Sequence, residues 1–413
     1  MAFNASAMDP RHSMLFLCEG DAETADSFSG SSRALVTTLR EFGWRVRPTD
    51  VLAKGAADLL SKVLTVHPVR AHWSARYHYG PMGHALRSAR ARQAVTAHPV
   101  GAPVLQIGAT FDIGASEKRL FFYCDANAAQ GARGGEYSTV TSLTGRELKA
   151  MIERERRAYH RAAGIFTISE CLRQSFINDF GVPPERVVTV HAGSNLRRLP
   201  PDAPRQSSPT STPPTILFIG RQFERKGGRT LLAAFAVVRR ALPDARLIVA
   251  GGQPNIGELP GVSVIGYIDP DRQGPGSVEA LYGSADLFCM PSHYEPFGIV
   301  LVEAMLHGVP CIGANCWAMP EIIDDEETGW LVPPGSVEAL ASRLISALSN
   351  RPRLRAMGEE ARKRARARFS WRKTVARMVE YMEHAETCRV PMATTSTPSR
   401  RPAPLADAAK LGA

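Results

Sequence analysis

The sequence predicts an α/β protein with two Rossmann-like domains that face each other across a cleft. In both halves of the chain, short apolar runs typical of buried strands alternate with helix-like segments, which is the pattern of parallel sheets with right-handed crossovers. A Pro-, Ser- and Thr-rich segment at residues 200–214 lies between the halves and is typical of a linker. The length of 413 residues also exceeds one domain of about 100–200 residues.

The second half shows the alternation most regularly. The segment 229–242 carries its apolar side chains on one helical face, and the segment 299–307 is followed by Gly308 and Pro310, which are typical of a helix end. We expect strands at 215–219, 246–250, 262–265, 286–290 and 310–313. We expect helices at 229–242, 278–283, 299–307 and 337–348.

The first half alternates less cleanly. Its strand-like runs are 14–18, 44–46, 104–107, 120–123 and 164–168. Its helix-like segments are 31–42, 145–162 and 171–180. Because ligands bind outside the carboxyl ends of the strands in open α/β sheets, two such domains predict a ligand site between them.

Five segments result from this division of the chain. We expect an N-terminal domain at 1–199, the linker at 200–214 and a C-terminal domain at 215–370. A last helix is expected at 371–386, where Val375, Met378, Val379 and Met382 give an apolar stripe. The tail at 387–413 resembles the linker in composition, so we expect it to be disordered.

The composition excludes several classes of protein. Hydrophobic residues make up 44% and charged residues 22%, as in ordinary globular proteins and unlike disordered or fibrous ones. No apolar run reaches the roughly 18 residues of a membrane-spanning helix, and we find no secretion signal. The seven cysteines have long spacings, which is neither a disulfide framework nor a zinc site. We therefore expect a cytoplasmic protein.

The net charge of +10 is mostly local. Residues 351–373 contain ten Lys or Arg and two Glu, which leaves the rest of the chain near neutral. We favour a solvated helical face for this stretch; the alternative is a surface for anionic lipid or an acidic ligand at the inner face of a membrane. No nucleic-acid-binding motif accompanies the charge, so we expect no nucleic-acid partner.

Two cations follow the first strand of the second half, in the sequence GRQFERKG at 220–227. Gly220 permits a tight turn, after which Arg221 and Lys226 are expected to point from the strand end toward the cleft. There they suit a diphosphate, Arg through paired hydrogen bonds and Lys as a point charge. The alternative is that both are solvated loop cations.

A second motif, SHYEPFGIVLVE at 292–303, is expected to begin a helix at a ligand. Gly298 lets a ligand approach the backbone, and the N–H groups of Gly298, Ile299 and Val300 form a helix N-terminus that suits phosphate. Glu295 lies just before this helix and Glu303 within it, and carboxylates accept hydrogen bonds from sugar hydroxyls. An alternative is that Glu295 only complements the dipole of this helix. The same explanation does not account for Glu303, which has apolar neighbours.

These motifs resemble glycosyltransferase family 4, the retaining nucleotide-sugar transferases of the GT-B fold. The resemblance covers most of the second half, in GRQFERKGG, RLIVAGG, ADLFCMPSHYEPFGIVLVEAMLHGVP and EETGWLVPPGSVEALA. It implies a donor domain in the second half, an acceptor domain in the first, and a last helix that crosses back onto the first domain. It also implies a metal-independent transferase of the hexosyltransferase type, so we expect no cofactor and no metal ligands.

The resemblance assigns roles to the donor-side residues. Arg221 and Lys226 correspond to the cations that bind the donor diphosphate, Glu295 to the acid that faces the donor sugar, and Glu303 to the acid that holds the ribose hydroxyls. The N–H groups of Gly298, Ile299 and Val300 are expected on phosphate or sugar oxygens. Backbone near 266–268, including Ile268, is expected to contact the base.

The resemblance is thinner in the first half, over residues 167–195 and at Ser29-Gly30-Ser31, which matches the family's glycine loop. In FFYCDANAA at 121–129, many members carry a His where this chain has Asp125. This departure leaves two interpretations of Asp125, a positioning carboxylate or a strand-end cap. We assign no catalytic role to Glu321.

The expected substrates are a UDP-, GDP- or ADP-sugar and a hydroxyl acceptor, which is a glycan, a lipid or a small molecule. Two other function classes remain open. A GT-B epimerase or hydrolase of nucleotide sugars would form product without an acceptor. A non-catalytic nucleotide-sugar-binding or scaffold protein would bind the donor without turnover.

Overall fold

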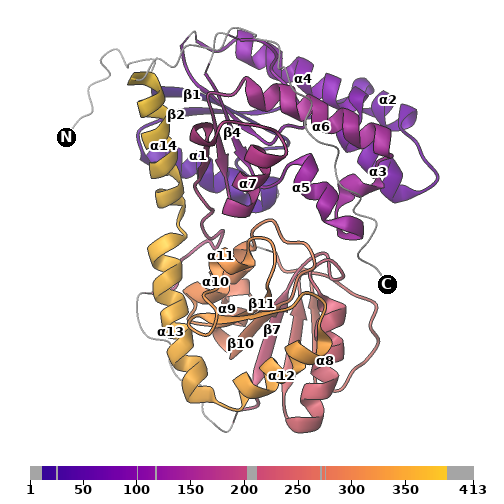
Figure 1. Cartoon of the computed structure of the whole chain (residues 1–413), viewed down its shortest axis with the longest axis vertical. Coiled ribbons are helices and arrows are strands. Elements are labelled where there is room, and N and C mark those ends of the chain that lie inside the picture. Colours follow the sequence, from indigo (N-terminus) through magenta and orange to yellow (C-terminus); the bar gives the residue numbers. More distant parts are fainter. Residues whose placement is uncertain are drawn as a thin grey trace.

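A computed structural model describes residues 12–24, 27–99, 101–116, 119–201, 212–269, 272–274 and 276–387. Most of the expected linker, residues 202–211, and the expected tail from residue 388 onward lie outside the described residues. The described part forms two domains, one above the other in Figure 1. Within it, no helix combines the length and the apolar character needed to cross a bilayer.

The N-terminal domain contains a six-stranded parallel sheet with the order β2-β1-β3-β4-β5-β6. Met14–Cys18 and Leu120–Cys124 are buried throughout, because helices cover both faces of such a sheet. The strands are β1 (Ser13–Cys18), β2 (Arg45–Asp50), β3 (Val104–Ile107), β4 (Leu120–Cys124), β5 (Gly164–Thr167) and β6 (Val187–Thr189).

The helices of this domain include four that the sequence did not predict, α2 to α5. The apolar residues of α2 face outward, α3 and α4 have no strong apolar stripe, and α5 has only six residues, so none of them gave the periodic signal of a helix packed on the core. The helices are α1 (Ser31–Glu41), α2 (Ala56–Leu64), α3 (Arg70–Tyr79), α4 (Pro81–Thr96), α5 (Ala128–Arg133), α6 (Gly145–His160) and α7 (Glu170–Asn178).

The C-terminal domain has a second six-stranded parallel sheet with the order β12-β11-β10-β7-β8-β9. Its strands are β7 (Thr215–Ile219), β8 (Arg246–Ala250), β9 (Val262–Gly266), β10 (Leu287–Met290), β11 (Cys311–Ala314) and β12 (Gly329–Val332). Its helices are α8 (Gly228–Ala241), α9 (Val278–Ser284), α10 (Ile299–Leu306), α11 (Met319–Ile322), α12 (Val337–Leu348) and α13 (Arg351–Arg368). The prediction of two parallel α/β domains is therefore confirmed.

The strands that sequence reasoning missed or shortened are edge strands. β6 and β12 were not predicted, and β2 is longer than the expected run at 44–46. An edge strand pairs on one side only and is less completely covered, so it does not need the continuous apolar run by which central strands are recognised.

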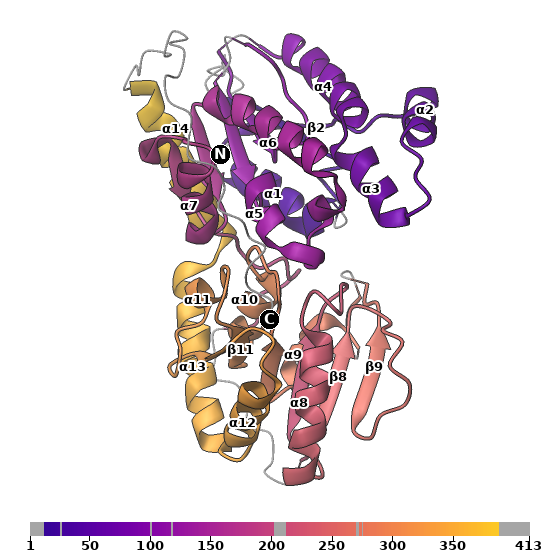
Figure 2. The ribbon, with the colours of Figure 1, turned by 45° about the vertical axis from the view of Figure 1, so that its right-hand side comes forward.

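The two domains are linked along one side by α13 and α14 (Trp371–Thr387), which form a column from the C-terminal to the N-terminal domain (Figures 1 and 2). The Trp371 Nε1–H donates to the Ser194 carbonyl at 2.9 Å. The Tyr381 hydroxyl donates to the Ala163 carbonyl at 3.2 Å. The last helix thus lies against the first domain.

The two domains contact each other through residues that follow the strand ends of each sheet. The Glu321 carboxylate, from α11, accepts hydrogen bonds from the N–H groups of Glu170 and Cys171 at the start of α7, at 2.7 and 2.9 Å. The ring of Tyr137 stacks on that of His293, with centroids 4.5 Å apart. The carboxyl edges of the two sheets therefore face each other.

Replacing Glu321 tests how much this contact holds the domains together. Glu321→Ala leaves two N–H groups of α7 without their carboxylate, so we expect about 2 kcal/mol less stability toward urea and a larger radius of gyration in solution scattering. Glu321→Gln keeps one acceptor oxygen and should be intermediate. An alanine variant with unchanged stability and radius of gyration would contradict this role.

Candidate functional site

Glycines dock the loop after β7 against the segment that precedes α10. Gly227 has a φ of +76°, and a Cβ there would lie 2.1 Å from the Pro291 carbonyl oxygen, so only glycine fits. A Cβ on Gly220 would lie 2.7 Å from Cδ of Lys226. The Lys226 side chain therefore runs across Gly220 toward Glu295.

Lys226 and Glu295 form a buried ion pair, with Nζ and Oε2 2.6 Å apart and exposed side-chain fractions of 13% and 8%. Burial lowers the pKa of Lys226, and the neighbouring Glu295 carboxylate opposes that shift. The guanidinium of Arg225 lies 3.6 Å from the same carboxylate oxygen and donates to the Tyr294 carbonyl at 2.6 Å. One carboxylate thus faces two cations.

Arg221, the other predicted diphosphate ligand, is not part of this cluster. Its side chain is exposed, and its guanidinium lies 4.9 Å from the centroid of the Tyr267 ring, at the end of β9. The second cation beside Glu295 is instead Arg225, which the sequence analysis did not select. Its position next to Lys226 in the same loop was the available signal.

The start of α10 lies next to the ion pair. Gly298 caps this helix with a φ of +103°, and a Cβ there would lie 3.4 Å from Cγ of Glu295. Ile299 and Val300 begin the helix, where backbone N–H groups have no carbonyl of the preceding turn to bond. The expected anion-binding N–H groups of Gly298, Ile299 and Val300 therefore lie beside Glu295 and Lys226.

Glu303 connects α10 to the N-terminal domain. Its Oε1 accepts the Asn195 backbone N–H at 3.0 Å, and its Oε2 accepts the Tyr282 hydroxyl at 3.1 Å. Burial raises the pKa of Glu303 to about 7, although both hydrogen bonds favour the ionised form. Tyr282 lies in no motif, and Asn195, the last residue of the segment 167–195 that resembles the family, had no role assigned to it.

The glycine loop of the N-terminal domain reaches the same place. The Asn195 Nδ2 group donates to the Ser29 carbonyl at 2.7 Å and to the Ser31 hydroxyl at 3.2 Å. Phe28, Ser29 and Gly30 have φ values of 51°, 54° and 86°. Left-handed conformations cost non-glycine residues about 1–2 kcal/mol each and cluster at functional sites. Ser29 and Ser31, on either side of Gly30, are therefore joined to Glu303 through Asn195.

Asp125 lies at the end of β4, half-buried, near Arg225 of the other domain. Burial raises its pKa to about 6, while two backbone N–H groups and the charge of Arg225 oppose the rise. The capping hydrogen bond of the next helix, α5, comes from the Asn127 side chain, which accepts the Gln130 N–H at 2.8 Å. The Asp125 carboxylate itself accepts backbone N–H groups at the strand end, so a positioning carboxylate and a strand-end cap both remain as interpretations.

The remaining expected positions lie at the carboxyl edge of the second sheet. Ile268 is buried, two residues after β9 and next to Tyr267. Gly220 donates its N–H to the Ala250 carbonyl at 2.9 Å, and Gly251 packs against its backbone. The Gly220 backbone therefore lies between the Lys226 side chain and the loop after β8.

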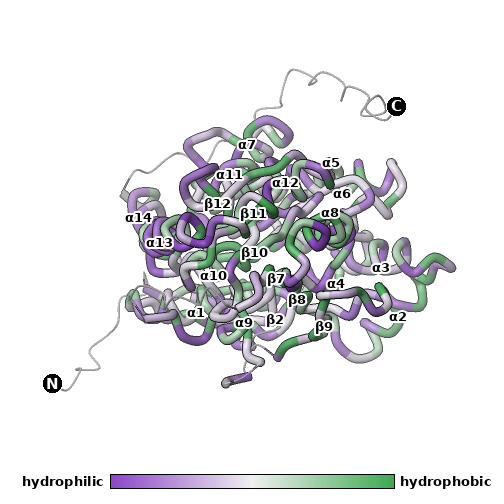
Figure 3. Tube along the Cα trace, turned by 90° about the horizontal axis from the view of Figure 1, so that it is seen from below, coloured by the Kyte–Doolittle hydropathy of each residue, from purple (hydrophilic) through white to green (hydrophobic). Residues whose placement is uncertain are grey.

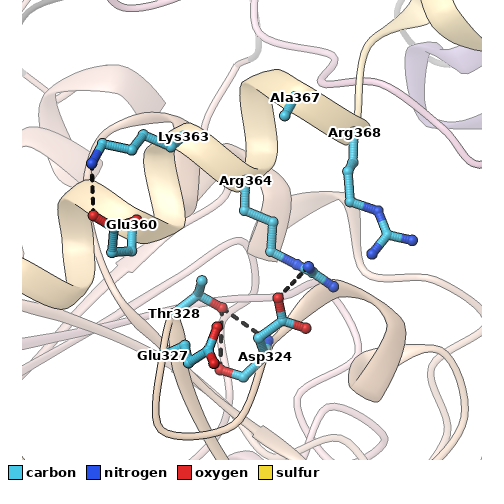
Figure 4. A pocket seen from close by; sticks show the side chains of 8 residues that line it. All are labelled: Asp324, Glu327, Thr328, Glu360, Lys363, Arg364, Ala367 and Arg368. Carbon is cyan, nitrogen blue, oxygen red and sulfur yellow. Dashed lines mark hydrogen bonds and ion pairs between the residues drawn. The ribbon is translucent and has the colours of Figure 1, made fainter.

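A separate open pocket of about 540 Å³ lies beside α13, away from this site (Figure 4). It is lined by Asp324, Glu327, Thr328, Glu360, Lys363, Arg364, Ala367 and Arg368. Lys363 is paired with Glu360 at 2.7 Å, and Arg364 with Asp324. Pairing inside the chain fits the solvated-face interpretation of the basic stretch.

The described residues contain no group of three or more His, Cys, Asp or Glu side chains that could hold a metal ion. The chain has one Asp-x-Asp sequence, Asp269-Pro270-Asp271, which places two carboxylates close together in the sequence. Residues 270 and 271 lie outside the described part. The expectation of a metal-free site therefore stays a prediction.

Comparison with known proteins agrees with the donor-side motifs. Residues 201–364 match the model of the family described as glycosyl transferases group 1. The chain is 36% identical over 168 residues to a D-inositol 3-phosphate glycosyltransferase of Segniliparus rotundus, which covers 38% of this chain and 37% of that protein. It is 28% identical over 244 residues to a GDP-mannose-dependent alpha-(1-6)-phosphatidylinositol monomannoside mannosyltransferase of Mycobacterium tuberculosis, covering 54% and 62%.

Among solved structures, a sucrose-phosphate synthase of Thermosynechococcus elongatus has the same fold. The TM-score is 0.66 at 19% identity, over 91% of this chain and 100% of that one. The two curated relatives are matched over less than two thirds of their own length. The GT-B fold and a glycosyltransferase domain in the second half are therefore confirmed.

The ion pair predicts unequal effects of two neutral substitutions. Glu295→Gln leaves the buried Lys226 ammonium beside Arg225 without a carboxylate, so we expect a loss of about 3 kcal/mol in urea unfolding. Lys226→Met leaves Glu295 with Arg225, so a smaller loss is expected. Glu224→Gln, in an exposed pair with Arg229, is the control and should change little. Equal losses at Glu295 and Lys226 would contradict this asymmetry.

Glu303 predicts a pH dependence of stability. Its folded pKa of about 7 exceeds the ordinary value of 4.5, so the folded state binds the proton more tightly than the unfolded state. The contribution of Glu303 to stability should fall as the pH rises from about 4.5 to about 7, by up to about 1.4 kcal/mol per pH unit. Unfolding of Glu303→Gln across this range should show a slope less negative by that amount, and identical slopes would contradict it.

Proposed function

We propose that this protein is a retaining glycosyltransferase of family 4, which moves a sugar from a nucleotide diphosphate sugar to a hydroxyl acceptor without a metal ion. The observation that carries the proposal is the buried Lys226–Glu295 pair at the N-terminus of α10. A buried ion pair costs desolvation and is weak evidence for a stabilising role, so its position beside a helix N-terminus supports a ligand-binding role.

The donor diphosphate would bind at the start of α10. Lys226 would turn from Glu295 to a phosphate oxygen, and Arg221, which is exposed beside Tyr267, would close over the other phosphate. The N–H groups of Gly298, Ile299 and Val300 add the positive end of a helix dipole. These groups would stabilise the charge that develops on the departing diphosphate.

The two glutamates would bind the sugars on either side of that diphosphate. Glu295, freed from Lys226, would accept hydroxyl groups of the donor sugar. Glu303 would hold the ribose hydroxyls in exchange for its present hydrogen bonds from Asn195 and Tyr282. Donor binding would then loosen the link between Glu303 and the N-terminal domain.

The acceptor would approach from the side of Asp125. Its carboxylate, with a pKa of about 6, is ionised in a large fraction of molecules at neutral pH and would position an acceptor hydroxyl. In the retaining reaction of this family, the leaving phosphate takes the proton of that hydroxyl. Residues of the chain would therefore orient the two substrates and need not form a covalent bond.

The donor nucleotide is proposed to be UDP, GDP or ADP with an attached sugar. One relative is named for its dependence on GDP-mannose, and its match covers 54% of this chain. The proposed acceptor is a hydroxyl of a glycan, a lipid or a small molecule. The family match at 201–364 does not narrow this choice, because it lies outside the N-terminal domain that would select the acceptor.

Thermal unfolding with UDP, GDP, ADP and their common sugars tests the donor site. Because a ligand of the folded state raises the melting temperature, we expect one nucleotide to stabilise the wild type at millimolar concentration. Arg221→Ala should lose most of that shift, since its exposed side chain is not needed for folding. Arg355→Ala, an exposed cation on α13, is the matched control and should keep it.

Turnover assays with the same nucleotide sugars, with and without acceptors, separate the alternatives. Turnover of the donor without any acceptor would indicate an epimerase or hydrolase, and donor binding without turnover across an acceptor panel would indicate a binding or scaffold protein. If no nucleotide shifts the melting temperature, the proposal is wrong. Anomeric proton coupling in the product's NMR spectrum tests retention.

A further inference from the structure

Helix α2 packs with its polar side toward the protein. Ser61 is 1% exposed, and Asp58 is half-buried and accepts the Tyr77 hydroxyl of α3 at 2.5 Å. The Lys62 carbonyl, at the same helix, accepts the Trp73 indole N–H at 3.1 Å. Water-soluble helices normally bury their apolar stripe, so this orientation is inverted.

The apolar side chains of α2 and of the segment after it point outward. Half of the twelve large hydrophobic residues that are exposed in the described part of the chain lie within this stretch of eleven residues, with exposed fractions from 50 to 65%. They are Leu59, Leu60, Val63, Leu64, Val66 and Val69. We call this set the α2 patch. Scattered exposed residues need no explanation, but a contiguous patch marks an interaction surface.

The α2 patch projects from the molecule. α2 lies at the outer end of the N-terminal domain, on the opposite side from α14, in two views (Figures 1 and 2). The tube seen from below carries apolar colour along this projecting segment (Figure 3). Because the α2 patch projects, it can insert into a deformable surface without a steric clash between that surface and the rest of the domain.

The surroundings of the α2 patch are basic. Residues 51–111 contain seven Lys or Arg and a single acid, Asp58, which is paired with Lys62 at 2.7 Å. Lys54 precedes the patch and Lys62 lies within it, with exposed side-chain fractions of 65% and 46%, and Arg70 follows it, also exposed. Lys54 is paired with Asp50 at 3.0 Å, but an exposed pair of this kind contributes little, so its ammonium group remains available to a lipid phosphate. An apolar ridge with a cationic border is complementary to an anionic lipid surface.

We propose that the α2 patch inserts into the interface of a bilayer containing anionic phospholipids and anchors the protein there. The apolar side chains would enter the boundary between head groups and acyl chains, while Lys54, Lys62 and Arg70 meet the phosphates. Bilayer contact through the patch does not depend on the proposed reaction.

The position of α3 gives this anchor a consequence for the site, which rests on the proposed function. α3 starts at Arg70, directly after the patch, and ends at Tyr79, whose pKa is raised by burial and by the negative charge of Asp125. Ten helical residues span about 15 Å. A bilayer at the patch would thus lie about one short helix away from the acceptor side.

The α2 patch is a better candidate for membrane contact than the basic stretch 351–373 on α13, for which a lipid surface was only the alternative to a solvated face. On α13, Arg362 is paired with Glu359 at 2.8 Å and Lys363 with Glu360 at 2.7 Å. The exposed side of that helix carries no large hydrophobic residue with a high exposed fraction. Charge without exposed apolar side chains beside it binds a bilayer less well than charge beside an apolar ridge.

Vesicle flotation of the full chain tests the anchor. We expect the wild type to float with vesicles of equal parts phosphatidylcholine and phosphatidylglycerol at low salt, and much less with phosphatidylcholine alone. Leu60→Glu with Val63→Glu should weaken binding about tenfold or more. Val237→Glu, on an exposed position of α8, and Arg355→Glu with Lys363→Glu, on α13, should leave it near the wild-type level.

Amide exchange on vesicles gives a second readout, in which residues 56–69 should be protected. Circular dichroism of each variant checks that it remains folded. The proposal is overturned if the wild type stays off anionic vesicles, if the Leu60 and Val63 variant binds normally, or if the α13 variant alone abolishes binding. It is also overturned if the wild type is a dimer by light scattering and the patch variant a monomer, because a second copy then covers the patch.

Loss of bilayer binding with unchanged nucleotide-dependent melting shifts would leave the proposed function intact. A failed nucleotide panel with intact vesicle binding would remove the proposed function and leave the anchor. The two proposals can therefore fail separately.

Discussion

Backbone N–H groups at the domain interface must find acceptors, and the structure supplies them from the opposite domain. Glu321 of the C-terminal domain bonds the first N–H groups of α7, and Glu303 bonds the N–H of Asn195. An N–H left unbonded at a buried interface costs free energy comparable to a lost hydrogen bond. The relative position of the two sheets, and hence the whole site, depends on these cross-domain carboxylates.

The site itself concentrates charge in a poorly hydrated place. Lys226 has a lowered pKa, and Asp125 and Glu303 have raised ones, with burial as the largest cause in each case. Groups held away from their ordinary pKa respond strongly to a new charge nearby. An incoming diphosphate would supply such a charge, and the carboxylates and cations that now pair with each other are the groups that would change partners.

The outer end of the N-terminal domain, unlike the domain interface, exposes apolar side chains. There, Asp58 and Ser61 face the protein and leucines face outward, which is unfavourable for a surface in water. Contact with the apolar part of a bilayer, as proposed, would make this arrangement favourable. At the domain interface, polar groups are hydrogen-bonded within the protein. At α2, apolar side chains are exposed instead.

The sequence by itself determined the central strands, their alternation with helices and the donor-side motif around Glu295 and Gly298. Apolar runs and glycine positions are local properties, so they can be recognised without knowing the fold. The tertiary structure alone decided that Arg225 rather than Arg221 lies beside Glu295, and that Asn195 joins Glu303 to the glycine loop. Those contacts join residues up to 166 positions apart, and no local pattern encodes such a pairing. The outward orientation of the apolar side of α2 could likewise not be predicted, because periodicity identifies an apolar stripe but not which side of the helix packs on the protein.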